Sequence, residues 1–283
     1  MFEGKKVAFL ATGGGGRGIA HAGVIKACEK LNIKFDILIG ASAGAIAVVY
    51  YNQYKNVDKM IDHFRPKRKR HYKFEQLNWK RMLSFKSFFS KNIKSGFFDT
   101  AGGEEFFRKT LAINDFDKLD TPLYISVTNL NTNSGVLFGP NIEPKISISK
   151  AIIASCCVPI LFRPVKINGH YYVDGEIKRP MSIQSAVDFG ADVVIVSDMY
   201  APCVKDIGTS NMFNIAGQIA NMMLEDKSYR GIQFCKVRYP DKQIILVSPA
   251  TGDLSAFSTG SYERLVNAGY NAAIKAFQDS GEI

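Results

Sequence analysis

Histidine is scarce in this chain of 283 residues, and its scarcity narrows the catalytic chemistry that the chain can perform. A Ser-His-acid hydrolase needs a histidine base, which in α/β-hydrolases follows both the serine and the acid. His21 lies within a helical pattern, and His63 and His71 flank a basic segment, which leaves His170 as the candidate. His170 follows Gly169 in a turn and has no clear acid partner in the expected order. A triad esterase that uses His170 is therefore an alternative and not the preferred interpretation.

Cysteine pairs and long apolar runs are missing as well. The cysteines are odd in number and show no C-x-x-C spacing, which argues against a disulfide framework and against a zinc site. We expect reduced thiols, no metal and no cofactor. No run of about 18 apolar residues is present, and the apolar stretch after Met1 is too short for a secretory signal. These absences predict a folded cytoplasmic protein with no signal peptide and no transmembrane segment. The cysteines are Cys28, Cys156, Cys157, Cys203 and Cys235.

Glycine, by contrast, is concentrated in two turns near the start of the chain. The second turn, residues 40–44, reads G-A-S-A-G and matches the G-x-S-x-G pattern of a nucleophile turn. The apolar segment 35–39 predicts a buried strand before it, and segment 45–54 predicts a helix after it. A serine at such a turn is held in a strained conformation that exposes its hydroxyl, and small neighbours let strand and helix approach. Ser42 is therefore predicted to be a nucleophile.

The first glycine turn, residues 13–18, follows a strand-like segment and precedes a helical pattern over 19–31. Free backbone N–H groups and the positive end of the helix dipole converge at such a place, which favours anion binding. We expect an oxyanion hole there, formed by the N–H groups of Gly15, Gly16 and Arg17. The Arg17 side chain has two equally plausible roles, contact with a substrate phosphate or an ion pair that holds the loop.

The same turn satisfies G-x-G-x-x-G, the spacing of a dinucleotide-binding loop, and this alternative is weaker. Dinucleotide binding requires an acidic residue at the end of the second strand, and residues 40–42 are Gly-Ala-Ser. A phosphate-binding loop requires Lys and Ser or Thr after the last glycine, where this chain has Ile19 and Ala20. The glycine turn is therefore better explained as an anion cradle beside Ser42.

A carboxylate is the remaining candidate for the base that activates Ser42. Tyr172 and Val173 belong to an alternating strand pattern that ends in Asp174-Gly175, a turn signal that presents a carboxylate at the strand end. An ordinary aspartate, with a pKa of ~3.9, is a weak base for a serine hydroxyl. Desolvation of Asp174 would raise that pKa and improve it as a base.

These three motifs resemble those of the patatin-like phospholipase family, whose members use a serine-aspartate dyad and no histidine. Residues 13–18 are similar to the family's G-G-G-x-R/K-G loop, residues 40–44 to its nucleophile turn, and Asp174-Gly175 to its aspartate motif. Weaker similarities lie at residues 96–99 and 154–162. The resemblance implies a lipid acyl hydrolase, of phospholipase A or lysophospholipase type, that acts on lipid esters through an acyl-enzyme.

One residue departs from the family pattern. The position after Asp174-Gly175 is usually Gly or Ala in the family, and here it is Glu176. A second carboxylate beside the dyad could raise the pKa of Asp174, although we expect Glu176 to point into solvent and assign it no catalytic role. A catalytically silent lipid-binding or scaffolding protein, disabled by Glu176, is the alternative from a different functional class.

Alternation of strand-like and helical segments predicts the fold class. Segments 123–129, 193–198 and 243–247 are rich in β-branched residues, whereas helical spacing recurs between and after them. We therefore expect a single α/β domain over residues 1–283, with a largely parallel central sheet in a three-layer α/β/α arrangement. The helical segments are 103–111, 181–189, 212–226 and 262–277.

A basic, aromatic-rich insertion is expected at about residues 55–95. Eleven basic residues and one acid lie in segment 65–94, which therefore accounts for the whole net charge of +10. Basic residues among large aromatics favour contact with an anionic membrane surface over nucleic acid or a merely solvated face. The segment could serve as a lid over the site and place the protein peripherally on a membrane. The expected contact residues are Arg68, Lys69, Arg70 and Trp79.

Overall fold

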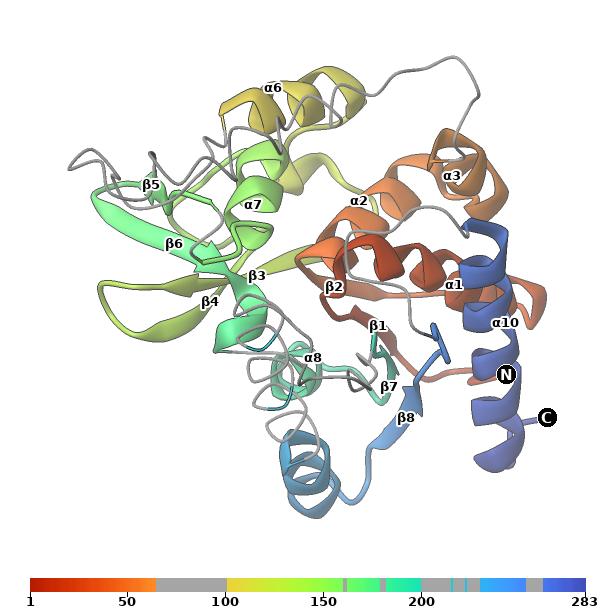
Figure 1. The fold of residues 1–283 in the computed structure, drawn as a ribbon. Helices are drawn as coiled ribbons and strands as arrows, with labels where there is room; N and C mark the ends of the chain where they lie inside the picture. Colours follow the sequence, from red (N-terminus) through yellow and green to blue (C-terminus); the bar gives the residue numbers. More distant parts are fainter. Residues whose placement is uncertain are drawn as a thin grey trace.

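A central sheet flanked by helices forms the fold (Figure 1), and strands such as Val7–Ala11 and Val193–Ser197 are fully buried apolar runs. The computed structural model describes residues 1–64, 101–159, 162–178, 182–199, 230–252 and 262–283, with the single positions 215 and 222. Within these residues the sheet has eight strands, in the order β5-β6-β3-β2-β1-β7-β8, with β4 paired to β3. The strands are β1 (Val7–Ala11), β2 (Ile37–Ala41), β3 (Leu123–Asn129), β4 (Ser134–Phe138), β5 (Val165–Ile167), β6 (His170–Asp174), β7 (Val193–Ser197) and β8 (Gln243–Val247).

The direction of the strands divides the sheet into two parts. β3, β2, β1, β7 and β8 pair in parallel, as the alternating pattern predicted. β4, β6 and β5 form an antiparallel extension beyond β3. The largely parallel sheet of the sequence analysis is therefore confirmed, and the antiparallel edge is an addition to it.

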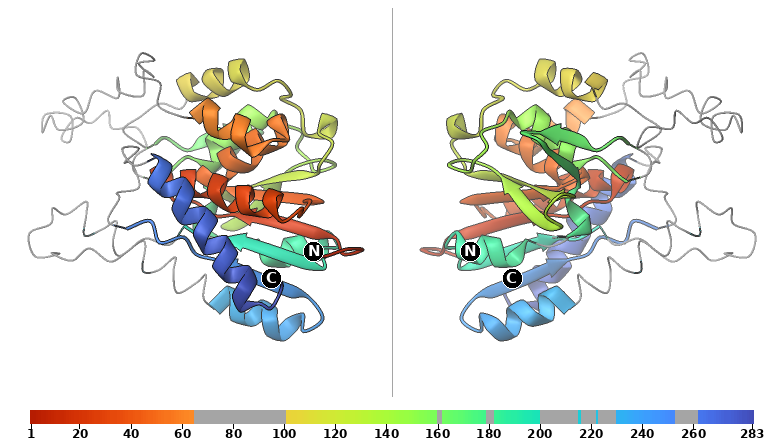
Figure 2. Two further views of the ribbon diagram at one scale, coloured as in Figure 1. Left: turned by 90° about the vertical axis from the view of Figure 1, so that its right-hand side faces the viewer. Right: turned by 90° about the vertical axis from the view of Figure 1, so that its left-hand side faces the viewer.

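Helices cover both faces of the sheet, as the two side views show (Figure 2). Residues 230–238 are also helical. The α-helices are α1 (Ala20–Lys30), α2 (Ala43–Tyr54), α3 (Val57–Phe64), α6 (Ala101–Thr110), α7 (Ile148–Ser155), α8 (Ile183–Asp188) and α10 (Tyr262–Asp279), and the 3-10 helices are η1 (Gly15–Ile19), η3 (Phe116–Lys118) and η4 (Gly175–Ile177).

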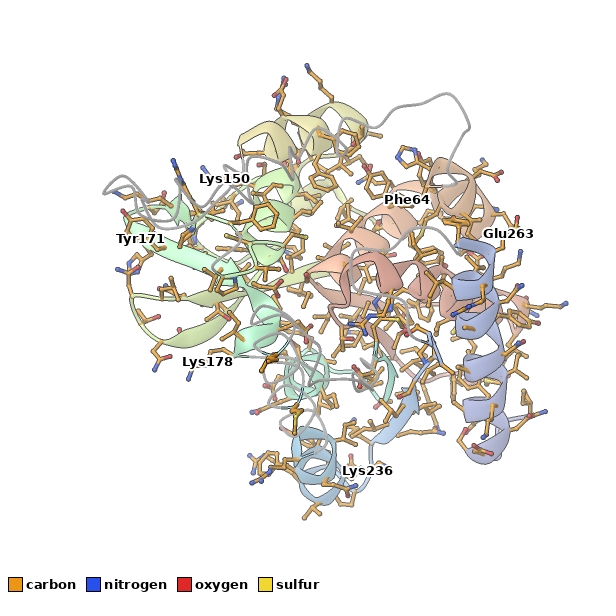
Figure 3. All side chains as sticks on the ribbon, viewed as in Figure 1. Phe64, Lys150, Tyr171, Lys178, Lys236 and Glu263 are labelled. Atoms are coloured by element: carbon orange, nitrogen blue, oxygen red, sulfur yellow. The ribbon has the colours of Figure 1, made fainter. Side chains whose placement is uncertain are left out.

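Alternation along the strands produces two separate cores. On β1, Phe9 packs into the core beneath α1, α2 and α10, whereas Ala8 and Leu10 face the core beneath α8. On β7, Ile195 and Val196 divide between the two cores in the same way. Side chains fill the space between the ribbon layers on both sides (Figure 3). This arrangement confirms the three-layer α/β/α architecture.

Helices α1 and α10 pack with almost no space between their backbones. A Cβ atom at Gly23 would overlap the carbonyl of Val266, and one at Gly269 would overlap the carbonyl of Ala20. Both glycines therefore allow the close approach of α1, which follows the first glycine loop, and α10, which lies near the C-terminus.

We expect Gly23→Ala to lower the free energy of unfolding by roughly 1–3 kcal/mol, because the added methyl group forces the two helices apart. Denaturant unfolding measures this change. Gly102→Ala is the matched control, since Gly102 lies in α6 with no atom within 4 Å of an added Cβ. Alanine there should stabilise the helix by up to about 1 kcal/mol. Equal stability of Gly23→Ala and the wild type would contradict the packing account.

Candidate active site

Ser42 stands at the sharp turn between β2 and α2 in a backbone conformation that L-residues avoid, with φ 51° and ψ −122°. The glycines on either side make this turn sterically possible. A Cβ at Gly40 would lie 2.6 Å from the Cα of Ala45, and one at Gly44 would overlap the carbonyl of Ala11. The prediction that small neighbours allow strand and helix to approach is confirmed by this geometry.

Two other serines hold the nucleophile turn in place. The backbone N–H of Ser42 donates to the hydroxyl oxygen of Ser155, at the end of α7, over 2.8 Å. The Ser155 hydroxyl in turn donates to the carbonyl of Ser126 on β3, over 2.7 Å. Ser155 is fully buried and out of reach of water, so these two bonds satisfy its hydroxyl and the groups bonded to it. The sequence analysis assigned no role to Ser155 or Ser126.

Sheet register brings Asp174 to the same place. Ala41 of β2 pairs with Ser126 of β3, and Val127 of β3 pairs with Asp174 of β6. Ser42 follows Ala41 directly, so its side chain and that of Asp174 lie on either side of β3, at the carboxyl ends of β2 and β6. The Asp174 backbone is fixed by an N–H bond to the carbonyl of Cys157 over 3.0 Å.

The Asp174 carboxyl is buried, and burial raises its pKa from 3.8 to about 6. Hydrogen bonds from the backbone N–H of Glu176 and from the Ser42 hydroxyl lower the pKa and limit the rise. The Glu176 N–H lies 3.0 Å from Asp174 Oδ1. An ionised Asp174 in contact with the Ser42 hydroxyl is a base positioned to accept the serine proton. The Ser42 hydroxyl also hydrogen-bonds the thiol of Cys156, whose pKa burial raises.

The first glycine turn lies between β1 and α1 and begins with the short helix η1. Gly14 and Gly15 have φ values of 153° and 55°, which favour glycine. Among the residues that the structure describes, the N–H groups of Gly14, Gly15 and Gly16 have no hydrogen-bond partner. The N–H of Arg17 donates to the carbonyl of Gly14 over 3.2 Å. Of the three predicted oxyanion donors, Gly15 and Gly16 are therefore available, and Arg17 is already bonded within the turn.

The Arg17 side chain is buried along the same turn, with 5% of its surface exposed. Its Nε donates to the carbonyl of Gly14 over 3.3 Å, and burial lowers its pKa. No carboxylate within the described part of the chain forms an ion pair with it. Within the described residues, Arg17 holds the loop through a hydrogen bond to Gly14, and the two roles expected for its side chain stay predictions.

Glu176 does not point into solvent, and that expectation was wrong. Its Oε1 accepts a hydrogen bond of 2.8 Å from the backbone N–H of Gly13. A Cβ at Gly13 would lie 2.8 Å from the Cγ of Glu176 and 3.2 Å from the Cβ of Ser42. Burial first, and then the charge of Asp174, raise the pKa of Glu176 well above its ordinary value. The turn of η4 directs this side chain toward the glycine loop, which a sequence pattern does not reveal.

His170 lies at the opposite end of β6 from Asp174 and is exposed. Four residues of extended strand separate the two positions by roughly 13 Å. His21, in contrast, is fully buried, and both of its ring nitrogens are engaged, with the carbonyl of Thr12 and the hydroxyl of Ser197. Neither histidine therefore contacts Ser42, and the triad that uses His170 is not supported.

Other expectations fall partly or wholly outside the described residues. Arg68, Lys69, Arg70 and Trp79 lie in segment 65–100, of which the structure describes nothing. Cys28, Cys156, Cys157 and Cys235 are free thiols, and Cys203 is not described. In the described ranges, no three His, Cys, Asp or Glu side chains lie together as a metal site requires. None of the helices described there combines the length and the apolar character of a membrane span.

Parts of the chain are similar in sequence to known lysophospholipases. Lysophospholipase nte1 of Aspergillus fumigatus is 27% identical over 199 residues, which make up 69% of this chain and 12% of that protein. Lysophospholipase NTE1 of Coccidioides immitis is 50% identical over 48 residues, which make up 17% of this chain and 3% of that protein. The chain thus spans only a small part of the length of these curated relatives.

Among solved structures, human GIVD cytosolic phospholipase A2 has a similar fold, with a TM-score of 0.52 and 13% identity. That likeness covers 98% of this chain and 58% of the human chain. The sequence model of the patatin-like phospholipase family matches residues 12–187, more than half of the chain. This match includes the glycine loop, Ser42 and Asp174, and the chain belongs to the patatin-like phospholipase family.

Proposed function

We propose that this chain is a lipid acyl hydrolase, of phospholipase A or lysophospholipase type, with Ser42 as nucleophile and Asp174 as base. The observation that carries the proposal is the meeting of these two side chains across β3. A serine with positive φ lies against a buried carboxylate of raised pKa, beside glycine N–H groups that have no partner among the described residues. The names of the lysophospholipase relatives support lipid esters as the substrate class.

The first half of the reaction forms an acyl-enzyme. Ser42 Oγ attacks the ester carbonyl while Asp174 accepts the hydroxyl proton, and the carbonyl oxygen becomes an oxyanion. The N–H groups of Gly14, Gly15 and Gly16 are the donors available to this oxyanion. Each such donor is typically worth about 3–4 kcal/mol of transition-state stabilisation. Collapse of the intermediate breaks the ester bond, and Asp174 returns its proton to the departing alkoxide.

The second half releases the acyl group by the reverse roles. Asp174, ionised again, accepts a proton from a water molecule as the water oxygen attacks the acyl-serine carbonyl. The second oxyanion uses the same glycine donors. Breakdown of this intermediate returns the proton to Ser42 Oγ and frees the fatty acid. Besides the ester and one water molecule, both halves use the same groups: Ser42, Asp174 and the glycine N–H groups.

A silent lipid-binding protein is the competing function, and the position of Glu176 bears on it. Glu176 would disable the site if its carboxyl occupied the oxyanion donors. It bonds instead to the N–H of Gly13, one residue before the three glycines with available N–H groups. This placement supports an active enzyme over a silent one.

The same proposal assigns the basic segment 65–94, which lies outside the described residues, to contact with anionic lipid. Its support is the sequence alone: eleven basic residues and one acid among large aromatic residues. Each Lys or Arg near an acidic lipid surface contributes roughly 1 kcal/mol of attraction. Such a segment would bring the dyad to packed lipid without taking part in the chemistry.

Ser42→Ala and Asp174→Asn should each reduce hydrolysis of a short-chain ester by at least roughly 10³-fold, because each removes a group that moves in the transition state. Circular dichroism should show both variants folded. A fluorophosphonate probe should label the wild type at Ser42 and leave Ser42→Ala unlabelled. His170→Ala is the matched control and should retain turnover. Wild-type activity in either dyad variant would contradict the assignment, and an unlabelled wild type would favour the silent protein.

The raised pKa of Asp174 predicts opposite effects of pH on activity and on stability. Hydrolysis requires ionised Asp174, so kcat/KM should fall as pH drops below about 6. The folded state holds the Asp174 proton more tightly than the unfolded state does, so stability should fall as pH rises from about 4 to about 6. Asp174→Asn should remove this dependence and be more stable than wild type at pH 7, by about 3 kcal/mol at most. Thermal unfolding at pH 4 and pH 7 measures it, and equal pH dependence of both proteins would refute it.

Reversal of Arg68, Lys69 and Arg70 to glutamate should weaken binding to anionic vesicles and slow hydrolysis of packed lipid. Hydrolysis of a soluble short-chain ester should remain nearly unchanged, because the cluster recruits the surface and takes no part in the reaction. Wild-type binding should weaken as salt rises, and emission of Trp79, the only tryptophan, should shift to the blue on vesicles. Equal binding to neutral and anionic vesicles, with unchanged emission, would exclude the membrane role.

A further inference from the structure

The peptide bond between Thr12 and Gly13, at the entrance to the glycine loop, is held from both of its polar ends. Its carbonyl oxygen lies 2.8 Å from Nε2 of His21, which belongs to α1. Its N–H donates to Oε1 of Glu176, which belongs to η4, also over 2.8 Å. The two partners, His21 and Glu176, lie far apart in the sequence, so only the folded chain brings both to this peptide. A single peptide plane is thus fixed between two side chains that no step of the proposed reaction uses.

The hydrogen-bond partners of His21 define its tautomer. A carbonyl oxygen can only accept, so Nε2 must carry the proton that it donates to Thr12. Nδ1 is then the acceptor for the Ser197 hydroxyl, 2.8 Å away. Burial lowers the pKa of His21 to about 4, so the ring is neutral at physiological pH. His21 is therefore a permanent donor to the Thr12 carbonyl and not a proton carrier.

At the Glu176 end, the hydrogen bond to Gly13 requires only an acceptor oxygen. Burial and the charges of Asp174 and Asp198 raise its pKa, while the bond from Gly13 lowers it. In the neutral acid, a carbonyl-type oxygen still accepts from Gly13 N–H. Glutamine has the same shape and the same acceptor, and alanine has neither. This pair of substitutions separates the hydrogen bond from the negative charge.

The glycine loop has a physical need for such restraint. Residues 13–16 are four consecutive glycines, the residue type with the largest backbone freedom. The candidate oxyanion donors at Gly14, Gly15 and Gly16 follow directly on Gly13, so a rotation of the Thr12–Gly13 peptide displaces all of them. A misplacement of about 1 Å at a catalytic group can cost roughly 10²-fold in rate.

We propose that His21 and Glu176 are positioning residues that clamp the Thr12–Gly13 peptide and thereby aim the glycine N–H groups at the oxyanion. The proposal rests on the Ser42-Asp174 dyad as the proposed function. The clamp also sets the loop against the nucleophile, because Gly13 packs on both Glu176 and Ser42. Thr12 is fixed further through its hydroxyl, which bonds Asp198 over 3.1 Å and accepts from the N–H of Met199 over 2.9 Å.

The kinetic test uses a short-chain ester at pH 8, where Asp174 is ionised in every variant. Glu176→Ala should lower kcat by roughly 10²-fold with KM nearly unchanged, because only oxyanion stabilisation is lost. Glu176→Gln should keep kcat within a few-fold of wild type. His21→Gln retains an N–H close to the position of Nε2, so its kcat should be higher than that of His21→Met. Glu3→Ala, which removes an exposed carboxylate, is the control and should match the wild type.

A spectroscopic test reports on the clamp itself and needs no activity. Carbonyl-¹³C threonine combined with ¹⁵N glycine selects Thr-Gly pairs, which occur only at 12–13, 251–252 and 259–260. Thr251→Ser and Thr259→Ser remove the other two signals in turn and so assign Gly13. The Gly13 amide should exchange slowly with solvent in the wild type and in Glu176→Gln, and faster in Glu176→Ala.

The outcomes separate the clamp from the dyad. Wild-type kcat in folded Glu176→Ala would overturn the clamp, and so would a Glu176→Gln variant as impaired as Glu176→Ala, since charge would then be the cause. Unchanged exchange of the Gly13 amide in Glu176→Ala would overturn it even if that variant were inactive. Failure of the dyad would appear instead as retained hydrolysis in Ser42→Ala. Loss in Ser42→Ala, loss in Glu176→Ala and rescue in Glu176→Gln together support both.

Discussion

The backbone of Ser42 is the constraint on which the candidate site depends. A non-glycine residue at positive φ and extended ψ costs on the order of 1–3 kcal/mol and persists only where its surroundings fix it. Here they do so from several directions. Gly40 and Gly44 allow β2, α2 and β1 to meet without overlap, and Ser155 binds the Ser42 N–H. The strained turn places the hydroxyl at the carboxyl end of the sheet, where the helix that follows points its N-terminus.

The sheet supplies the second partner through strand direction. β6 runs antiparallel to β3, and its last residue, Asp174, pairs with Val127. β6 ends directly in η4, and the side chains of its N-cap residue, Asp174, and its second residue, Glu176, face the site. Asp174 meets Ser42, and Glu176 meets Gly13. One strand end therefore provides both the base and a contact to the glycine loop.

The sequence was sufficient for those parts of the site that local patterns encode. Gly40, Ser42 and Gly44 are a local steric solution, and the alternating strand before Asp174 ends in a recognisable turn, so the nucleophile and aspartate motifs were predictable. Hydrophobic alternation does not encode strand direction, which is why the antiparallel edge of β4, β5 and β6 was not predicted. The alternation of strand-like and helical segments along the chain did predict the parallel core.

Side-chain direction and buried polar pairing were beyond the reach of the sequence. Glu176 was expected in solvent because most glutamates are exposed, yet η4 turns it toward the loop. His21 was interpreted as a helix residue and Ser155 only as part of the weaker similarity at 154–162, because the carbonyl of Thr12 and the N–H of Ser42 reach them only through tertiary packing. A polar residue within an apolar helical face is a local signal of a buried hydrogen bond, but it does not predict which group forms that bond.

The two carboxyl groups at the end of β6 share a space that favours one charge over two. Burial raises the pKa of both, and the charge of Asp174 raises that of Glu176 further. Two interacting acids in such a space titrate as a pair, and the group with the better hydrogen bonds to its ionised form loses its proton first. Asp174 accepts from the N–H of Glu176 and from the Ser42 hydroxyl, so it is the group that ionises first. Glu176, whose pKa is raised by burial and by the charge of Asp174, accepts the hydrogen bond from Gly13. The environment thus favours the charge on Asp174, the proposed base, and leaves the Glu176 carboxyl in contact with the loop, so a second acid beside the proposed dyad is compatible with catalysis.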